Sequence, residues 1–227
     1  YGANRVLPLL DYGIIAENPK IFVGYSDITA FLTSITQKTN LVTFHGPMLT
    51  TYKESWIEYN YGLMQRVLFG EKFIKLFSPN DLEPKILKEG KAIGPLWGGN
   101  MCLLTNRLGS AEELNTNGSI LFLEDIDEYL YSFERMLVQM RNARMFDNIK
   151  GLIFGELKDM KDQEIKFGRN TDEIILDICG DLNIPIISNF PCGHGKFQST
   201  LPISVTTEID TTNKEAMVTI IDNAVEI

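Results

Sequence analysis

Residues 120–123, with the sequence Ile-Leu-Phe-Leu, restrict the fold of this chain more than any other segment. An unbroken apolar run of this length is typical of a strand covered on both faces, as in a parallel sheet with helices on either side. In residues 1–70, β-prone runs alternate with stretches whose apolar residues follow helical spacing, such as residues 28–35. The sequence therefore predicts an α/β fold.

A connection between two structural units is indicated between residues 71 and 97. The periodicity weakens there, and prolines and glycines recur. A chain of 227 residues is long enough for two small domains. We therefore predict an N-terminal α/β domain over residues 1–75, a linker over residues 76–95 and a C-terminal domain over residues 96–227.

Charge and composition exclude several classes of function. The formal net charge of −9 disfavours nucleic acid as a partner. No apolar stretch approaches the roughly 20 residues of a membrane-spanning helix, so no membrane partner is expected. The three cysteines are far apart, which argues against a disulfide framework or a zinc ribbon and favours a reducing compartment such as the cytoplasm. Two histidines are too few for a His-rich metal site.

Ser26 follows a predicted strand and precedes a predicted helix. A tight turn at such a point exposes a side chain beside free N–H groups of the helix start, which suits a serine nucleophile. The usual pattern has glycine on both sides; here Gly24 is present, but Ile28 stands two positions after the serine. On position alone, a cap of the helix by Ser26 or Asp27 is the favoured interpretation.

Glu124 directly continues the apolar run and would lie at the carboxyl edge of the sheet, where open α/β folds bind their ligands. A carboxylate at that depth needs a hydrogen-bonding partner. We interpret its neighbours Asp125 and Asp127 differently, as solvated residues of an acidic cluster that favours the start of the next helix.

His194 lies in residues 189–195, a segment whose glycines and proline predict a loop. Imidazole has an unperturbed pKa of about 6.5, so this histidine is the natural general base. His45 is the second candidate, although its place before a proline turn suits a structural hydrogen bond equally well.

The chain resembles the LD-carboxypeptidases, a family that also contains the microcin C immunity peptidases. The resemblance covers essentially all 227 residues. It is carried by motifs in the same order and spacing: Tyr1-Gly2-Ala3-Asn4-Arg5, Gly24-Tyr25-Ser26-Asp27-Ile28-Thr29, His45-Gly46-Pro47-Met48, Gly98-Gly99-Asn100, Leu123-Glu124-Asp125-Ile126, and Gly193-His194-Gly195 with Leu201-Pro202.

This resemblance implies a catalytic triad of Ser26, Glu124 and His194 that needs no metal or organic cofactor. It also implies a flavodoxin-like N-terminal domain that carries the serine and a swivelling β/α C-terminal domain that carries the glutamate and the histidine, with the site between them. The backbone N–H of Asp27 would supply half of the oxyanion hole.

Two departures from the family pattern are visible. Family members carry a further segment before the Tyr-Gly match, so we expect the N-terminal domain to be truncated at its start. An upstream glycine of that segment would supply the other oxyanion N–H, and its absence would leave the enzyme incomplete. The second departure is Ser204, which stands where glycine is usual.

The resemblance implies a substrate and a state of assembly. The substrate is a cytoplasmic murein tetrapeptide, from which terminal D-alanine is released from an L-centred diamino acid, and the assembly is a homodimer. We expect Gly99, Asn100 and Glu128 to contact the substrate. A protein of net charge −9 suits a substrate with a free amine.

Two other functions stay open. An immunity peptidase that cuts a peptide-nucleotide toxin needs an aromatic surface for the base, and Trp56 and Trp97 are the only tryptophans. At the position of Glu128 the carboxypeptidases of the family are acidic and the microcin enzymes carry lysine, which favours the carboxypeptidase. An inactive member that only binds muropeptides is the third interpretation.

Overall fold

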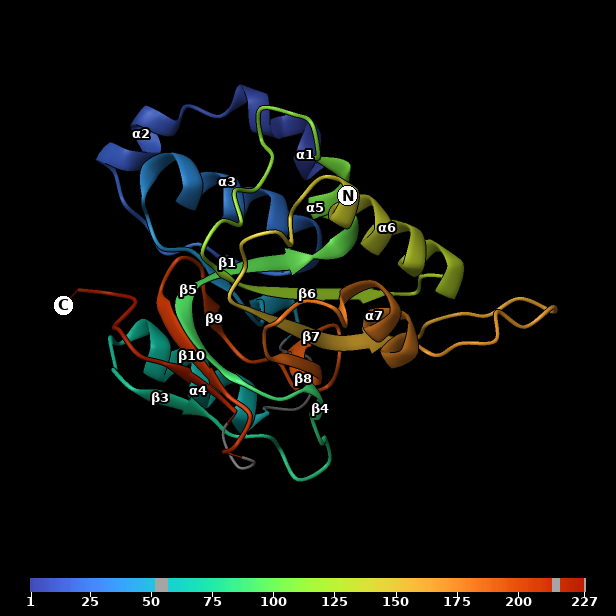
Figure 1. The fold of residues 1–227 in the computed structure, drawn as a ribbon. Coiled ribbons are helices and arrows are strands. Elements are labelled where there is room, and N and C mark those ends of the chain that lie inside the picture. The colour runs from blue at the N-terminus through green and yellow to red at the C-terminus, as the bar shows by residue number, and fades with distance from the viewer. Residues whose placement is uncertain (52–56, 214–216, 227) are drawn as a thin grey trace.

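The computed structural model describes residues 1–51, 57–213 and 217–226. Its centre is an eight-stranded sheet in the order β3-β11-β10-β5-β6-β7-β8-β4 (Figure 1). The four strands β5 to β8 are parallel neighbours, and the remaining pairings are antiparallel. The strands span Ile74–Leu76 (β3), Lys85–Lys88 (β4), Lys91–Asn100 (β5), Ile120–Ile126 (β6), Gly151–Lys158 (β7), Ile186–Gly193 (β8), Thr206–Asp210 (β10) and Val218–Ile220 (β11).

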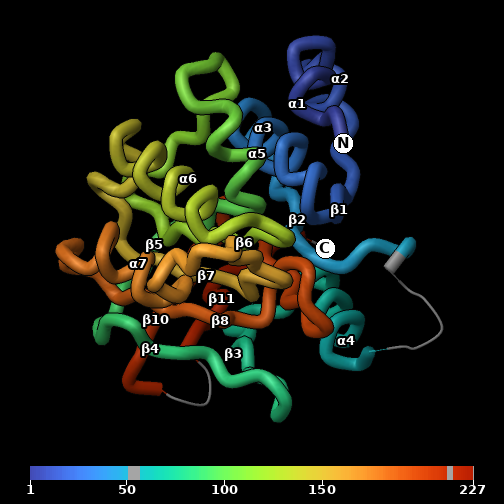
Figure 2. Tube along the Cα trace, turned by 90° about the vertical axis from the view of Figure 1, so that its right-hand side faces the viewer, coloured from blue at the N-terminus to red at the C-terminus, as the bar shows by residue number. Residues whose placement is uncertain are grey.

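Helices cover both faces of this sheet. Figure 2 shows α6 and α7 on one side of β6 to β8 and α4 on the other. The α-helices span Ala3–Val6 (α1), Tyr12–Glu17 (α2), Thr29–Thr39 (α3), Glu58–Leu68 (α4), Met101–Asn106 (α5), Leu130–Asn142 (α6) and Thr171–Cys179 (α7). Short 3₁₀ turns occupy Leu7–Leu9, Ser26–Ile28 and Leu49–Thr51.

Strand β6 confirms the prediction of a strand buried on both faces. Ile120 and Phe122 belong to the hydrophobic core on the side of α4. Leu121 and Leu123 belong to the core under α5, α6 and α7. The strand continues beyond Leu123, because β5 pairs with it as far as Glu124 and β7 as far as Ile126. Glu124 is therefore part of the strand and does not follow it.

A second, three-stranded sheet joins distant parts of the chain in the order β1-β2-β9. It consists of β1 (Val23–Gly24), β2 (Phe44–His45) and β9 (Leu201–Pro202). Strand β9 pairs antiparallel with β2, so residues near the end of the chain complete a sheet begun near its start.

The segment 76–95, predicted to be a linker, contains β4 and the first half of β5. Strand β4 pairs with β8, and β5 pairs with β10 and β6, so this segment is built into the large sheet. The sequence pattern does not predict these strands, because β4 carries lysine at both ends and β5 is interrupted by Gly94 and Pro95. The domain division itself stays a prediction.

Strand β8 is longer than the sequence suggests. The predicted loop over residues 189–195 begins as strand, because β8 extends to Gly193. Its pairing with β7 shifts register twice, and such irregularities accommodate the positive φ of Asn189 and the proline that follows. His194 comes directly after the strand.

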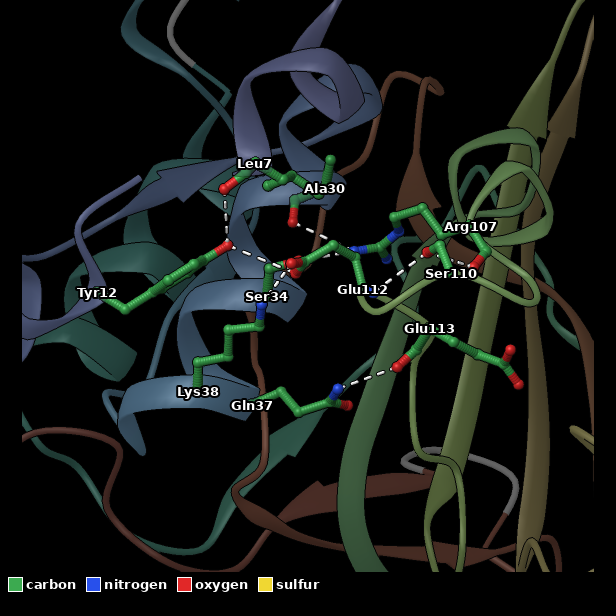
Figure 3. Close-up of polar contacts among 10 residues, drawn as sticks. All are labelled: Leu7, Tyr12, Ala30, Ser34, Gln37, Lys38, Arg107, Ser110, Glu112 and Glu113. Carbon is green, nitrogen blue, oxygen red and sulfur yellow. Dashed lines mark hydrogen bonds and ion pairs between the residues drawn. The ribbon is translucent and has the colours of Figure 1, made fainter. Parts of the chain in front are cut away.

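Arg107, the residue after α5, fastens helix α3 to the C-terminal half. Its buried guanidinium donates hydrogen bonds to the Ala30 carbonyl, to Thr33 Oγ1 and to Ser34 Oγ, at 3.3, 2.7 and 2.9 Å. Burial lowers the pKa of Arg107 to about 10. Figure 3 shows how Glu112 extends this network.

The outer part of the network is more exposed. Glu112 pairs with Lys38 of α3 and lies 3.5 Å from the hydroxyl of Tyr12 in α2. Gln37 donates to the carbonyl of Glu113. These contacts hold α3, whose start follows the turn of Ser26, in one place against the C-terminal half.

Replacing Arg107 by methionine should lower the free energy of unfolding by about 2–3 kcal/mol, because hydrogen bonds from a charged group to buried acceptors are lost. Arg66→Met is the matched control. Arg66 pairs with Glu71 at the surface, and its loss should cost less than about 1 kcal/mol. Urea unfolding followed by circular dichroism measures both values. Equal losses would show that Arg107 is not an anchor.

Candidate active site

Ser26 sits in a 3₁₀ turn between β1 and α3, and its φ is 60°. A left-handed backbone at a serine is strained and is typical of turns that present a nucleophile. The side chain of Ile28 fills the space over Gly24: a Cβ on Gly24 would lie 2.6 Å from its Cγ2 atom. This packing explains how isoleucine occupies the position that is glycine in the usual pattern.

The start of α3 lies directly against the carboxyl end of β5. A Cβ on Gly99, whose φ is 140°, would lie 2.4 Å from Cγ2 of Thr29. The Asn100 N–H donates to Thr29 Oγ1 at 3.1 Å. Gly99, predicted to contact substrate, thus allows the nucleophile turn and the sheet edge to approach each other.

Glu124 is fully buried at that same edge. Gly193 makes room for it: with a φ of 101°, it lies so close that an added Cβ would be 2.7 Å from Oε2 of Glu124. On the side of β7, a Cβ on Gly155 would lie 3.0 Å from the Cβ of Glu124. The carboxylate therefore occupies a space that neighbouring side chains would otherwise fill.

The carboxylate of Glu124 binds His194. Oε2 of Glu124 lies 2.8 Å from Nδ1 of His194, at the end of β8. Burial raises the pKa of Glu124, but the hydrogen bond from His194 and the nearby His45 outweigh it and lower the pKa to about 2. An ionised carboxylate on Nδ1 fixes the tautomer that leaves Nε2 free to accept a proton.

Tyr25, the residue before Ser26, brings the turn to this pair. Its ring packs edge-on against the ring of His194, with centroids 4.9 Å apart. Among the described residues no hydrogen bond joins Ser26 to His194. Catalytic hydrogen bonds of free enzymes often tighten only when substrate binds. The three predicted triad residues thus lie in one region.

His45, the second candidate base, is buried in β2. Its Nε2 atom lies 3.8 Å from Oε1 of Glu124, the oxygen that does not bind His194. The ring packs edge-on against Phe122, with centroids 5.1 Å apart. Both histidines therefore face one carboxylate, but only His194 is within hydrogen-bonding distance.

The interpretation of Asp125 as a solvated residue is wrong. Its side chain is buried and accepts hydrogen bonds from Asn100 Nδ2 at 3.1 Å and from the Cys102 N–H at 3.0 Å. Burial raises the pKa of Asp125 to about 6. Because the register with β7 shifts between Leu123 and Asp125, both Glu124 and Asp125 are buried in β6. Asp127 is exposed, as expected, and pairs with Lys161.

The predicted substrate-contacting residues Asn100 and Glu128 lie beside this cluster. Asn100 caps α5, because its Oδ1 accepts from the Leu103 N–H at 3.2 Å. One hydrogen of the Asn100 amide is already donated to Asp125. Burial and the charges of Asp125 and Glu128 raise the pKa of the Cys102 thiol in α5. Glu128 itself is partly buried and lies two residues before the start of α6.

Asp27 and the two tryptophans are the remaining predicted residues. The carboxylate of Asp27 accepts from the Ala3 N–H at 2.9 Å, and its backbone N–H lies in the first turn after Ser26. Trp97 is half-buried and packs against both cores. Trp56 lies outside the described residues.

Within residues 1–51, 57–213 and 217–226, no group of three or more His, Cys, Asp or Glu side chains is placed to hold a metal ion. None of the helices in the described part of the chain is both long and apolar enough to cross a membrane.

Comparison with known proteins defines the class. Residues 1–46 match the LD-carboxypeptidase N-terminal domain, and residues 93–209 match the LD-carboxypeptidase C-terminal domain. The chain is therefore a hydrolase of the serine peptidase class. It belongs to the LD-carboxypeptidase family, as the sequence motifs indicated.

Individual relatives span both branches of the family. "Probable murein peptide carboxypeptidase" of Bacillus subtilis (strain 168) is 33% identical over 96% of this chain and 68% of its own length. Microcin C7 self-immunity protein MccF of Escherichia coli is 33% identical over 96% of this chain and 70% of its own length.

A solved structure shares the fold. Muramoyltetrapeptide carboxypeptidase from Oxalobacter formigenes aligns with a TM-score of 0.83 at 28% identity, covering 98% of this chain and 76% of that one. The predicted α/β fold class is confirmed. Truncation of the N-terminal domain and swivelling of the C-terminal domain stay predictions.

Asp125 should give the stability of the protein a distinct pH dependence. Folding raises its pKa from 3.8 to about 6, so its contribution is complete below about pH 4 and is lost as the pH rises through about 6. Relative to Asp125→Asn, the free energy of unfolding of the wild type should fall by about 1–3 kcal/mol between pH 4 and 7.

Urea unfolding across this pH range measures the difference between the two proteins. Asp127→Asn is the matched control, because Asp127 is exposed and its φ of 65° suits asparagine. A difference between wild type and Asp125→Asn that does not change with pH would contradict the assignment.

Proposed function

We propose that this protein is a serine LD-carboxypeptidase that releases terminal D-alanine from an L-centred diamino acid in murein tetrapeptides. The observation that carries the proposal is the contact between the fully buried Glu124 and the partly exposed His194, 2.8 Å apart, beside the strained turn of Ser26. The names of the Bacillus and Oxalobacter relatives support the substrate class.

The reaction would proceed by acyl transfer. Ser26 Oγ attacks the carbonyl carbon of the diamino acid, and His194 Nε2 takes the hydroxyl proton. The oxyanion of the tetrahedral intermediate accepts a hydrogen bond from the backbone N–H of Asp27. As the peptide bond breaks, His194 returns the proton to the amine of D-alanine, which leaves. Water then hydrolyses the ester with His194 again as the base.

Glu124 would act without exchanging a proton. Its pKa of about 2 keeps it ionised at any pH at which His194 serves as a base. The charge orients the imidazole and stabilises the imidazolium that forms in each step. Its complete burial strengthens that interaction, because no water screens it.

Substrate recognition would use the cluster at the start of α5. We assign the D-alanine carboxylate to Asn100 and Gly99, and the cationic side chain of the diamino acid to Glu128. The amide nitrogen of Asn100 has a second hydrogen besides the one donated to Asp125, and Glu128 offers the opposite charge to an ammonium group. We also propose that the protein is cytoplasmic and forms a homodimer.

The alternative is an immunity peptidase that acts on a peptide-nucleotide. The 33% identity to MccF supports it. Against it stands Trp97, which is only half exposed and packs into both cores, so it offers little surface for stacking a base. An inactive muropeptide-binding member is the second alternative. The buried carboxylate of Glu124, bonded to His194, argues against it, because a buried charge is costly to retain without use.

Ser26→Ala should abolish D-alanine release, with kcat reduced by about 10⁴-fold or more, since the nucleophile is lost. The fold should be unaffected. Ser78→Ala, a serine in the segment between β3 and β4, is the matched control and should keep normal turnover. Chromatographic assay of D-alanine from a murein tetrapeptide measures the rates. Near-normal release by Ser26→Ala would disprove the proposed function.

Glu128→Lys should weaken cleavage of tetrapeptides with a free side-chain amine more than cleavage of analogues in which that amine is acetylated. The measurement is the ratio of kcat/KM for the two substrates. Glu164→Lys makes the same charge change on the exposed loop after β7 and should leave the ratio unchanged. An unchanged ratio in Glu128→Lys would remove the preference for the carboxypeptidase over the immunity peptidase.

A further inference from the structure

His45 is the one histidine that the proposed mechanism leaves unused. Its side chain is 1% exposed, and neither ring nitrogen has a hydrogen-bond partner among the described residues. Oε1 of Glu124 is buried and equally without a hydrogen bond. Buried polar atoms without partners are costly, and two of these unpaired atoms face each other.

The carboxylate of Glu124 lies between two imidazoles. Oε2 binds Nδ1 of His194 at 2.8 Å, and Oε1 faces Nε2 of His45 at 3.8 Å. A hydrogen bond between nitrogen and oxygen has a length of about 2.9 Å. A small rotation of the carboxylate, on the order of 1 Å at the oxygen, would close the second contact.

The backbone and the ring of His45 are both fixed. Strand β2 holds the backbone between β1 and β9, where His45 pairs with Gly24 and with Leu201. The ring of His45 packs edge-on against the ring of Phe122, with centroids 5.1 Å apart, and the ring of Tyr25 lies 6.5 Å from it. A ring held in this way keeps its Nε2 directed at one oxygen of Glu124.

We propose that His45 is a positioning residue of the peptidase reaction, which donates its Nε2–H to Oε1 of Glu124 and so keeps Oε2 directed at His194. The inference rests on the proposed function. In this role His45 does not touch substrate and takes no proton. It prevents the carboxylate from turning away from Nδ1 of His194, which would free the imidazole to adopt the wrong tautomer.

Glutamine and asparagine at position 45 provide a matched pair of variants. The side-chain amide of glutamine reaches about as far as Nε2 of histidine, whereas that of asparagine is one methylene shorter and cannot reach Oε1. His45→Gln should retain kcat within about threefold. His45→Asn should lower kcat by about ten- to a hundredfold, because the group that orients the Glu124 carboxylate is lost, and KM should be unchanged.

A double-mutant cycle separates positioning from simple packing. If His45 acts through Glu124, His45→Asn should change kcat less than about twofold in a Glu124→Gln background. An undiminished loss in that background would overturn the proposal. Equal kcat for the Gln and Asn variants of His45, both folded by circular dichroism, would also overturn it.

Proton NMR gives a readout that does not depend on turnover. The Nδ1–H of His194, bonded to a carboxylate, should give a strongly downfield resonance in the wild type and in His45→Gln, and this resonance should move upfield or broaden in His45→Asn. Recording the spectra on Ser26→Ala protein keeps this test separate from the proposed function. An unchanged resonance in His45→Asn would show that Glu124 keeps its orientation without His45.

Discussion

Burying the charged carboxylate of Glu124 costs several kcal/mol in free energy unless hydrogen bonds replace the lost water. Much of the surrounding structure supplies that replacement. The side chain lies within a strand paired on both sides, and Gly193 leaves the space that it occupies. One oxygen binds His194, and the other faces His45. The position of the histidine at the end of β8 therefore follows from the need to pair a charge that strand β6 places in the core.

The second constraint is the approach of helix α3 to the carboxyl end of β5. Gly99 allows Thr29 to come within contact of the sheet, and Arg107 holds the following turn of the same helix through three acceptors. Glu124 follows Ser26 by about a hundred residues in the sequence, and His194 follows it by about 170. These contacts bring the segments together without a disulfide, because the three cysteines are free.

Local sequence signals predicted the parts of the structure that local forces determine. The apolar run of residues 120–123 identified β6, and the turn of Ser26 was visible from the strand and helix on either side. The burial of Asp125 was not predictable, since it depends on a register shift and on partners in another strand. The strands within segment 76–95 were not predictable either, because pairing with neighbouring strands of the sheet stabilises them and they lack an apolar pattern of their own.

The three-stranded sheet bears on the order in which the chain folds during synthesis. Its middle strand, β2, has one edge that is paired only by β9, and β9 begins at Leu201. That edge stays open while more than a hundred and fifty residues are being made, and an open edge is a site for wrong pairing. During part of this time the turn of Ser26, beside β1, also lacks Glu124 and His194, which have not yet been made. The sheet beside the nucleophile turn is therefore completed only after His194, the last of the three predicted triad residues, has been made.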